Sequence, residues 1–212
     1  HTYTFLTAGT YTYHCSIHPA LNMWGSVTVT NASAGSFDSI GINIAGTNDD
    51  IVLHGTEATG FTTTVEQTGG SLTVEGDAIL SGNSYGVYAE DTDVVVDGAH
   101  MISGSNGSAM YVTGTSTLDA TDMDTSGKFG LNSDGVDFRW NGGESDADTA
   151  LIIDGGAEGS VENLTWDDVN TQIDARDYST VTSVGNTVDA SKLILASTAV
   201  IHEGNLLNSD IT

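Results

Sequence analysis

The sequence predicts an all-β protein built as a solenoid of stacked coils, and three observations carry this prediction. Short runs rich in Val, Ile and Thr recur along residues 37–212, separated by Gly, Asp, Asn and Ser. The runs return about every 21–22 residues, without the 3.6-residue periodicity of an amphipathic helix. Pro occurs once in 212 residues, which suits parallel strands that use nearly every backbone N–H.

The repeat is clearest where one strand of each coil ends. Its units end at a nearly constant interval, and they are Val52–Gly55, Thr73–Gly76, Val95–Gly98, Thr117–Ala120 and Arg139–Gly142. A further unit, Ile152–Gly155, follows after little more than half that interval, which predicts an interrupted register or an inserted turn. A single coil cannot bury its apolar side, so stacking at about 4.8 Å must pair the strands and build one continuous core.

In this period, residues 37–212 resemble the right-handed parallel β-helix of the pectate-lyase and periplasmic copper-processing superfamily. The resemblance implies short parallel strands joined at polar corners, where Gly and Asn supply positive φ angles. A β-sandwich of irregular strands is the alternative fold.

Residues 1–30 differ in composition from the repeat. They hold the one Cys, the one Pro and three of the six His, and residues 31–36 form a connector of small residues. This shift predicts a first domain at 1–30, a linker at 31–36 and the β-helix at 37–212. The chain opens and closes inside strand-like segments, so we expect it to be part of a longer protein.

The first domain contains a Cys-x2-His-x4-Met loop between two strand-like segments. A Gly-Thr-Tyr-x-Tyr strand leads to Cys15, His18 is followed by Pro, and Met23-Trp-Gly leads to a Val-rich strand. A thiolate, imidazoles and a weak thioether are the ligands of a blue-copper site. The alternative is a Cys and a Met packed in an ordinary core.

This loop resembles the copper loop of plastocyanin-type cupredoxins, including the halocyanins. The resemblance implies that Cys15, His18 and Met23 are three of the four ligands of a type 1 copper and that a redox partner protein exchanges electrons with it. The second His ligand of the family lies several strands upstream of the Cys, whereas here only the short segment from His1 to His14 precedes Cys15. One His ligand is therefore expected from outside this chain.

The charge is strongly negative, with 29 acidic and 4 basic residues and a formal net charge of −25. Such a surface repels nucleic acid and anionic membranes. Because the acids are dispersed among apolar residues, they predict a solvated surface, typical of a salt-adapted or marine microbe, at an extracellular or cell-surface location. No stretch approaches the ~18 apolar residues of a membrane-spanning helix. Calcium is a second candidate metal, and its candidate ligands are Asp49 with Asp50, Asp91 with Asp93, and Asp146 with Asp148.

One motif points to catalysis. Asn132-Ser-Asp134-Gly resembles the first acidic motif of β-helical polygalacturonases, and the adjacent acids Asp167 and Asp168 follow it further along the chain. Two carboxylates can act as acid and base in glycoside hydrolysis. The family's Gly-His-Gly and Arg-x-Lys motifs are absent, and Asn-Ser-Asp-Gly is also an ordinary turn.

These observations favour an electron-transfer or structural protein over an enzyme. The first hypothesis is a secreted or cell-surface protein in which the solenoid is the scaffold for a copper domain. The second is a structural or adhesive solenoid without metal. The third is a glycan-binding or glycan-degrading β-helix that uses Asp134 with Asp167 or Asp168.

Overall fold

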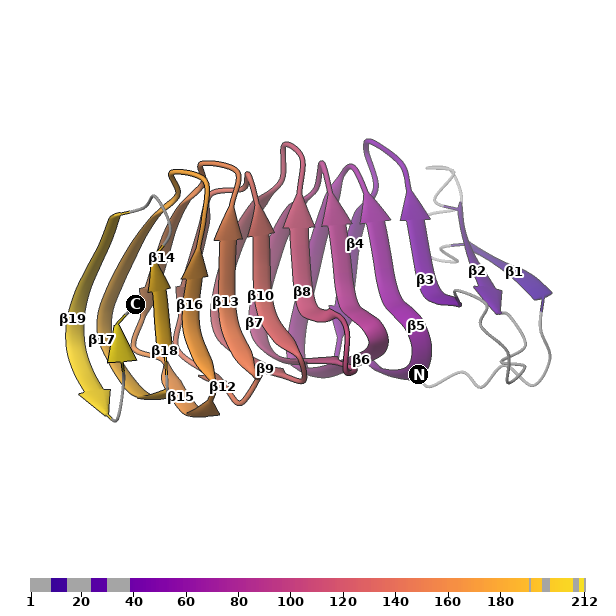
Figure 1. The fold of residues 1–212 in the computed structure, drawn as a ribbon. Coiled ribbons are helices and arrows are strands. Elements are labelled where there is room, and N and C mark those ends of the chain that lie inside the picture. Colours follow the sequence, from indigo (N-terminus) through magenta and orange to yellow (C-terminus); the bar gives the residue numbers. More distant parts are fainter. Residues whose placement is uncertain are drawn as a thin grey trace.

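The fold is a β-solenoid of about seven turns, which confirms the predicted all-β class (Figure 1). The computed structural model describes residues 9–14, 24–29, 39–190, 192–195, 199–207 and 210–211; from residue 39 on, it describes the side chains of 39–166 and 169–187. Within these ranges the regular structure is strands and turns, and no helix could span a membrane. Each strand of the solenoid pairs in parallel with the equivalent strand of the next coil.

The coils form three parallel sheets, which we name faces one, two and three. Face one consists of β3 (Ile40–Ala45), the end of β5 (Glu57–Thr68), the end of β6 (Ser71–Glu90), β8 (Ser108–Thr113), β10 (Phe129–Asp134), β13 (Thr149–Asp154), β16 (Thr171–Ala175), β18 (Lys192–Leu195) and β20 (Asp210–Ile211). Its strands lie side by side along the solenoid in Figure 1.

Faces two and three share several long strands that bend around a corner. Face two consists of β4 (Asp50–His54), the starts of β6, β7 (Asp93–Ser103) and β9 (Thr117–Ser126), then β11 (Phe138–Asn141), β14 (Glu158–Glu162) and the starts of β17 (Thr180–Ala190) and β19 (Ala199–Leu207). Face three consists of the start of β5, the middle of β6, the ends of β7 and β9, β12 (Glu144–Ser145), β15 (Thr165–Val169) and the ends of β17 and β19.

The core is a column of inward-facing side chains that runs through the coils. On face two, Leu53 is followed in register by Val74 and Val96, and Val74 and Val96 are at most 1% exposed. The start of β7 alternates exposed and buried residues, as expected for strands with one face on a core. Trp140 and Trp166 are the largest fully buried side chains in the described part of the chain.

The predicted repeat is in register for four of its units and wrong for Thr117–Ala120. Val95 pairs with Asp119, and Asp119 pairs in turn with Arg139. The counterpart of Gly98 in the intervening coil is therefore Asp122 and not Ala120. The reason is length: the coil from Asp93 to its partner Thr117 is longer than the preceding coil from Ser71 to Asp93, and the next coil is correspondingly shorter.

The unit Ile152–Gly155 does not belong to this column. Its strand, β13, lies on face one and pairs with β10, so the shortened interval reflects a change of face and not an inserted turn.

A column of residues with positive φ turns the chain from face two to face three. Its φ angles lie between 47° and 76°, and its members are Gly55, Gly76, Gly98, Asp122, Gly142, Asn163 and Gly185. Asp and Asn adopt this left-handed conformation more readily than other residues with a side chain. The strands β6, β7, β9 and β17 therefore bend here and continue on the next face.

Tyr178 is strained at the corner between faces one and two. Its φ is +64° and its side chain is 84% exposed, whereas the equivalent position of the previous coil is Gly156. A left-handed non-Gly residue costs about 1–2 kcal/mol, and Gly gives back about 0.5–1 kcal/mol in chain entropy. We expect Tyr178→Gly to raise the free energy of unfolding by up to about 1 kcal/mol in urea denaturation.

The control for this prediction is Thr182→Gly, at an exposed position inside β17. That change should lower the free energy of unfolding by about 0.5–1 kcal/mol, because Gly loses more entropy in a strand. Equal destabilisation by both variants would show that Tyr178 is not strained.

Candidate functional sites

The strands that flank the predicted copper loop form an antiparallel hairpin. β1 (Gly9–His14) pairs with β2 (Trp24–Val29) from Gly9–Val29 to His14–Trp24, in a two-stranded sheet separate from the solenoid sheet. Cys15, His18 and Met23 lie between these strands and outside the described residues. The pairing of His14 with Trp24 brings together the two ends of the segment that carries all three predicted ligands. In Figure 1 the hairpin lies beyond β3, at the N-terminal end of the solenoid.

The predicted catalytic acids come from different faces. Asp134 ends β10 on face one, whereas Asp167 and Asp168 lie on β15 of face three. The side chains of Asp167 and Asp168 are outside the described ones, so their use with Asp134 as acid and base stays a prediction. The Asp134 carboxylate accepts a hydrogen bond from the Tyr111 hydroxyl at 3.2 Å.

Most of the acidic side chains proposed for calcium link neighbouring coils. Asp91 Oδ1 accepts the backbone N–H of Thr115 at 2.8 Å and its hydroxyl at 3.0 Å. These two hydrogen bonds hold the pKa of Asp91 below its usual value. Three further links are Ser71 to Asp50 at 2.7 Å, Thr117 to Asp93 at 2.8 Å and Lys128 to Asp148 at 3.0 Å. In the described part of the chain, no group of three His, Cys, Asp or Glu residues is placed to hold a metal.

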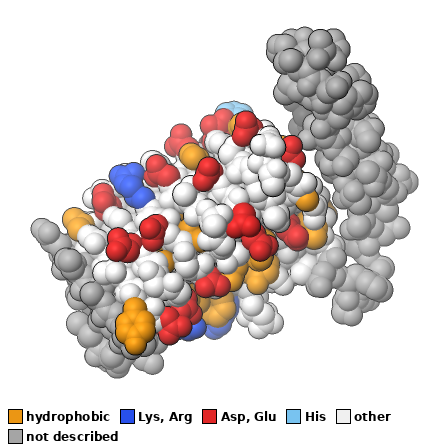
Figure 2. Space-filling view, turned by 90° about the horizontal axis from the view of Figure 1, so that it is seen from above, with side chains coloured by type: hydrophobic (Ala, Val, Ile, Leu, Met, Phe, Trp, Pro, Cys, Tyr) orange, Lys and Arg blue, Asp and Glu red, His pale blue; other side chains and the backbone are white. Residues whose placement is uncertain are grey.

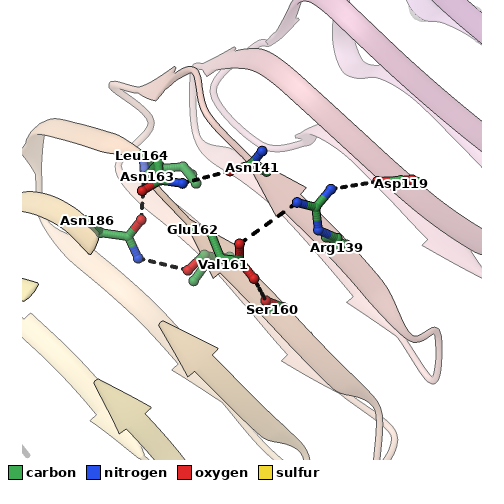
Figure 3. Close-up of polar contacts among 9 residues, drawn as sticks. All are labelled: Asp119, Arg139, Asn141, Ser160, Val161, Glu162, Asn163, Leu164 and Asn186. Carbon is green, nitrogen blue, oxygen red and sulfur yellow. Dashed lines mark hydrogen bonds and ion pairs between the residues drawn. The ribbon is translucent and has the colours of Figure 1, made fainter. Parts of the chain in front are cut away.

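Face two and its corner carry several separate polar contacts between consecutive coils (Figure 3). Arg139 lies between Asp119, at 3.5 Å, and Glu162, at 3.8 Å, so it bridges the coils on either side of its own. Asn163 donates to Asn141 Oδ1 at 2.9 Å. These side-chain contacts link consecutive coils on the outer surface, in addition to the backbone ladder.

Beneath this surface, Asn186 joins two coils from inside. Its Oδ1 accepts the backbone N–H of Leu164 at 2.7 Å, and its Nδ2 donates to the Val161 carbonyl at 3.0 Å and to Ser183 Oγ at 2.8 Å. The side chain is fully buried. The amide therefore supplies hydrogen bonds to backbone groups of the neighbouring coil at the buried corner.

A hollow of about 200 Å³ lies on face three beside the short strand β12. His100 Nδ1 lies 3.0 Å from Asp124 Oδ2, and Asp124 Oδ1 accepts the backbone N–H of Glu144 at 2.9 Å. Asp146 also lines the hollow, and none of its lining residues in the described part of the chain is Lys or Arg. The arrangement orients one imidazole against a fixed carboxylate and gives this hollow a negative charge.

Sequence reasoning missed three tyrosines that gather on face one. Tyr88 and Tyr111 are partners in register on adjacent coils, and their rings are stacked with centroids 5.3 Å apart. The centroid of the Tyr85 ring lies 5.6 Å from the centroid of each of these two rings. The spacing of Tyr88 and Tyr111 was the available signal, since it matches the length of one coil.

The Tyr111 hydroxyl should lose its proton at a higher pH than an ordinary tyrosine. Burial and the neighbouring Asp134 carboxylate raise its pKa to about 12. Because the folded protein retains this proton above the unfolded pKa of about 10, the contribution of Tyr111 to stability is present below pH ~10 and is lost as the pH rises towards ~12. We expect Tyr111→Phe to flatten the decline of unfolding free energy over this window, measured by urea denaturation at several pH values. An unchanged slope would contradict the assigned pKa.

The surface of the described part is acidic overall. Figure 2 shows Asp and Glu side chains spread over one face of the molecule, with few Lys or Arg among them. Comparisons with protein-family models, with curated proteins and with solved structures found no match to this chain.

Proposed function

We propose that this chain is a rigid surface scaffold that carries a type 1 copper loop at its N-terminal end, and that the parent protein uses this copper in electron transfer. The observation that carries the proposal is the β1–β2 hairpin, whose last pair joins His14 to Trp24. Because the two ends of the loop are held together, Cys15, His18 and Met23 can bind the same metal ion. Thiolate, imidazole and thioether form the donor set of blue-copper sites.

The solenoid supports the scaffold part of the proposal. Its core is continuous from coil to coil, and side-chain links such as Asp91–Thr115 and Arg139–Glu162 add to the backbone ladder. A stack of this kind resists bending because each coil is fixed to both neighbours. The dispersed acids keep such a rod solvated, which suits an extracellular or cell-surface location.

Copper addition tests the proposal. When this chain is combined with a segment that supplies the second His ligand, we expect an intense visible thiolate-to-copper absorption band on addition of Cu(II). Cys15→Ser should abolish the band, because the transition requires the thiolate. The control is His100→Ala, which removes an exposed imidazole that could bind copper non-specifically and should leave the band intact.

The outcomes separate the hypotheses. An absorption band that survives Cys15→Ser would overturn the proposal that this loop binds copper through the Cys15 thiolate. Absence of any band, together with an intact solenoid by circular dichroism, would favour a structural or adhesive scaffold without metal. Glycan binding or cleavage stays a prediction that rests on Asp134, Asp167 and Asp168.

A further inference from the structure

The stacked tyrosines on face one form an ordered pair. Tyr88 and Tyr111 lie directly opposite each other on β6 and β8, and their ring planes differ by 6° at a centroid distance of 5.3 Å. This distance is within the centroid range found for stacked aromatic pairs. Both side chains are partly exposed, so a small oxidant can reach them.

Each hydroxyl of the pair has its own carboxylate. Tyr111 donates to Asp134 Oδ2 at 3.2 Å, and the Tyr88 hydroxyl lies 3.5 Å from Glu90 Oε2. A phenol that loses one electron becomes strongly acidic and releases its proton. A tyrosine phenol is protonated at neutral pH, so the Tyr111 proton must be transferred during oxidation. Asp134 is placed to receive it.

We propose that Tyr88 and Tyr111 form an oxidative cross-linking site, at which a dityrosine bond joins two consecutive coils. Each phenol gives one electron to a one-electron oxidant, such as a peroxidase intermediate or a photo-oxidised metal complex, and its proton to the adjacent carboxylate. The two phenoxyl radicals couple through their ortho carbons into one C–C bond. Each coupled ring then loses its ortho hydrogen as a proton and regains a proton on oxygen, so the product lacks two hydrogen atoms in total.

The geometry selects this pair over the other tyrosines whose side chains the structure describes, Tyr85 and Tyr178. Tyr85 lies 5.6 Å from both rings, but its plane is inclined by 64° to Tyr88 and 58° to Tyr111. Tyr178 is 84% exposed at a distant corner and is available mainly to other molecules. A link from Tyr88 to Tyr111 would close a segment of one coil and reduce the freedom of the unfolded chain, as a disulfide does.

The test is oxidation of the full chain at low concentration with a photo-oxidised ruthenium complex and persulfate. We expect dityrosine fluorescence, a monomer lighter by two hydrogen atoms, and a cross-linked peptide pair containing Tyr88 and Tyr111. Tyr88→Phe and Tyr111→Phe should each abolish this product, while the matched control Tyr85→Phe retains it. The cross-linked monomer should unfold at a higher temperature than the untreated protein.

A further variant tests the role of the carboxylate. Asp134→Asn leaves the ring stack in place and removes the proton acceptor, so we expect the intramolecular product to form several-fold more slowly. Dimers without an intramolecular link, or a product joining Tyr85 to either partner, would overturn the proposal. Circular dichroism of each variant separates a lost cross-link from a lost fold. This inference is independent of copper binding, because none of its residues lies near the predicted loop in sequence.

Discussion

Trp140→Ala is expected to lower the free energy of unfolding by about 3–5 kcal/mol, among the largest effects of any single substitution in this solenoid. Trp140 is fully buried, and its indole N–H donates to the Met123 carbonyl at 3.1 Å. Truncation to Ala leaves a cavity between coils and removes the donor to this carbonyl. Urea denaturation followed by circular dichroism measures the loss.

Two variants make this prediction specific. Trp140→Phe keeps most of the ring volume and should cost less than the change to Ala. Val95→Ala removes a side chain that is 46% exposed and should cost less than about 1 kcal/mol. If Trp140→Ala were no more harmful than Val95→Ala, the column of stacked side chains would not be what holds the coils together.

Asn186→Leu is expected to lower the free energy of unfolding by about 2–4 kcal/mol. Leucine has a similar volume, but it leaves the Leu164 N–H and the Val161 carbonyl buried without the bonds that the amide provides. Each such group costs about 1–3 kcal/mol. The same denaturation experiment measures the effect.

The matched control is Asn170→Leu, at an exposed position that donates to Asp148 Oδ1 at 3.3 Å. We expect a change within about 0.5 kcal/mol there, because water replaces the lost bond. Similar effects at both positions would mean that the buried amide does not link the coils.

The stacking of coils could be predicted from the sequence because one strand of each coil recurs at a nearly constant interval along the chain. The alignment failed at Ala120 because the coils differ in length, as the pairs Ser71–Asp93 and Asp93–Thr117 show. Periodicity alone cannot place such an insertion. The inward position of Asn186 could not be predicted either, since an Asn at a corner usually faces solvent.

Some candidate sites could also be predicted from the sequence, and others could not. The copper loop is a local pattern, so Cys15, His18 and Met23 could be chosen without knowing the fold. The positions of the predicted catalytic acids depend on the fold. The segment from Asp134 to Asp167 is longer than one coil, and the residues beyond one full coil carry the chain from face one to face three. The tyrosine pair also depends on register, and it became visible only when Tyr88 and Tyr111 were known to be partners.

X-ray absorption at the copper edge, measured on the copper-loaded protein, shows directly whether the Cys15 thiolate binds the metal. We expect one short copper–sulfur bond from the Cys15 thiolate, with nitrogen ligands that include His18, and loss of the short bond in Cys15→Ser. A copper environment of nitrogen and oxygen alone in the unaltered protein would contradict it.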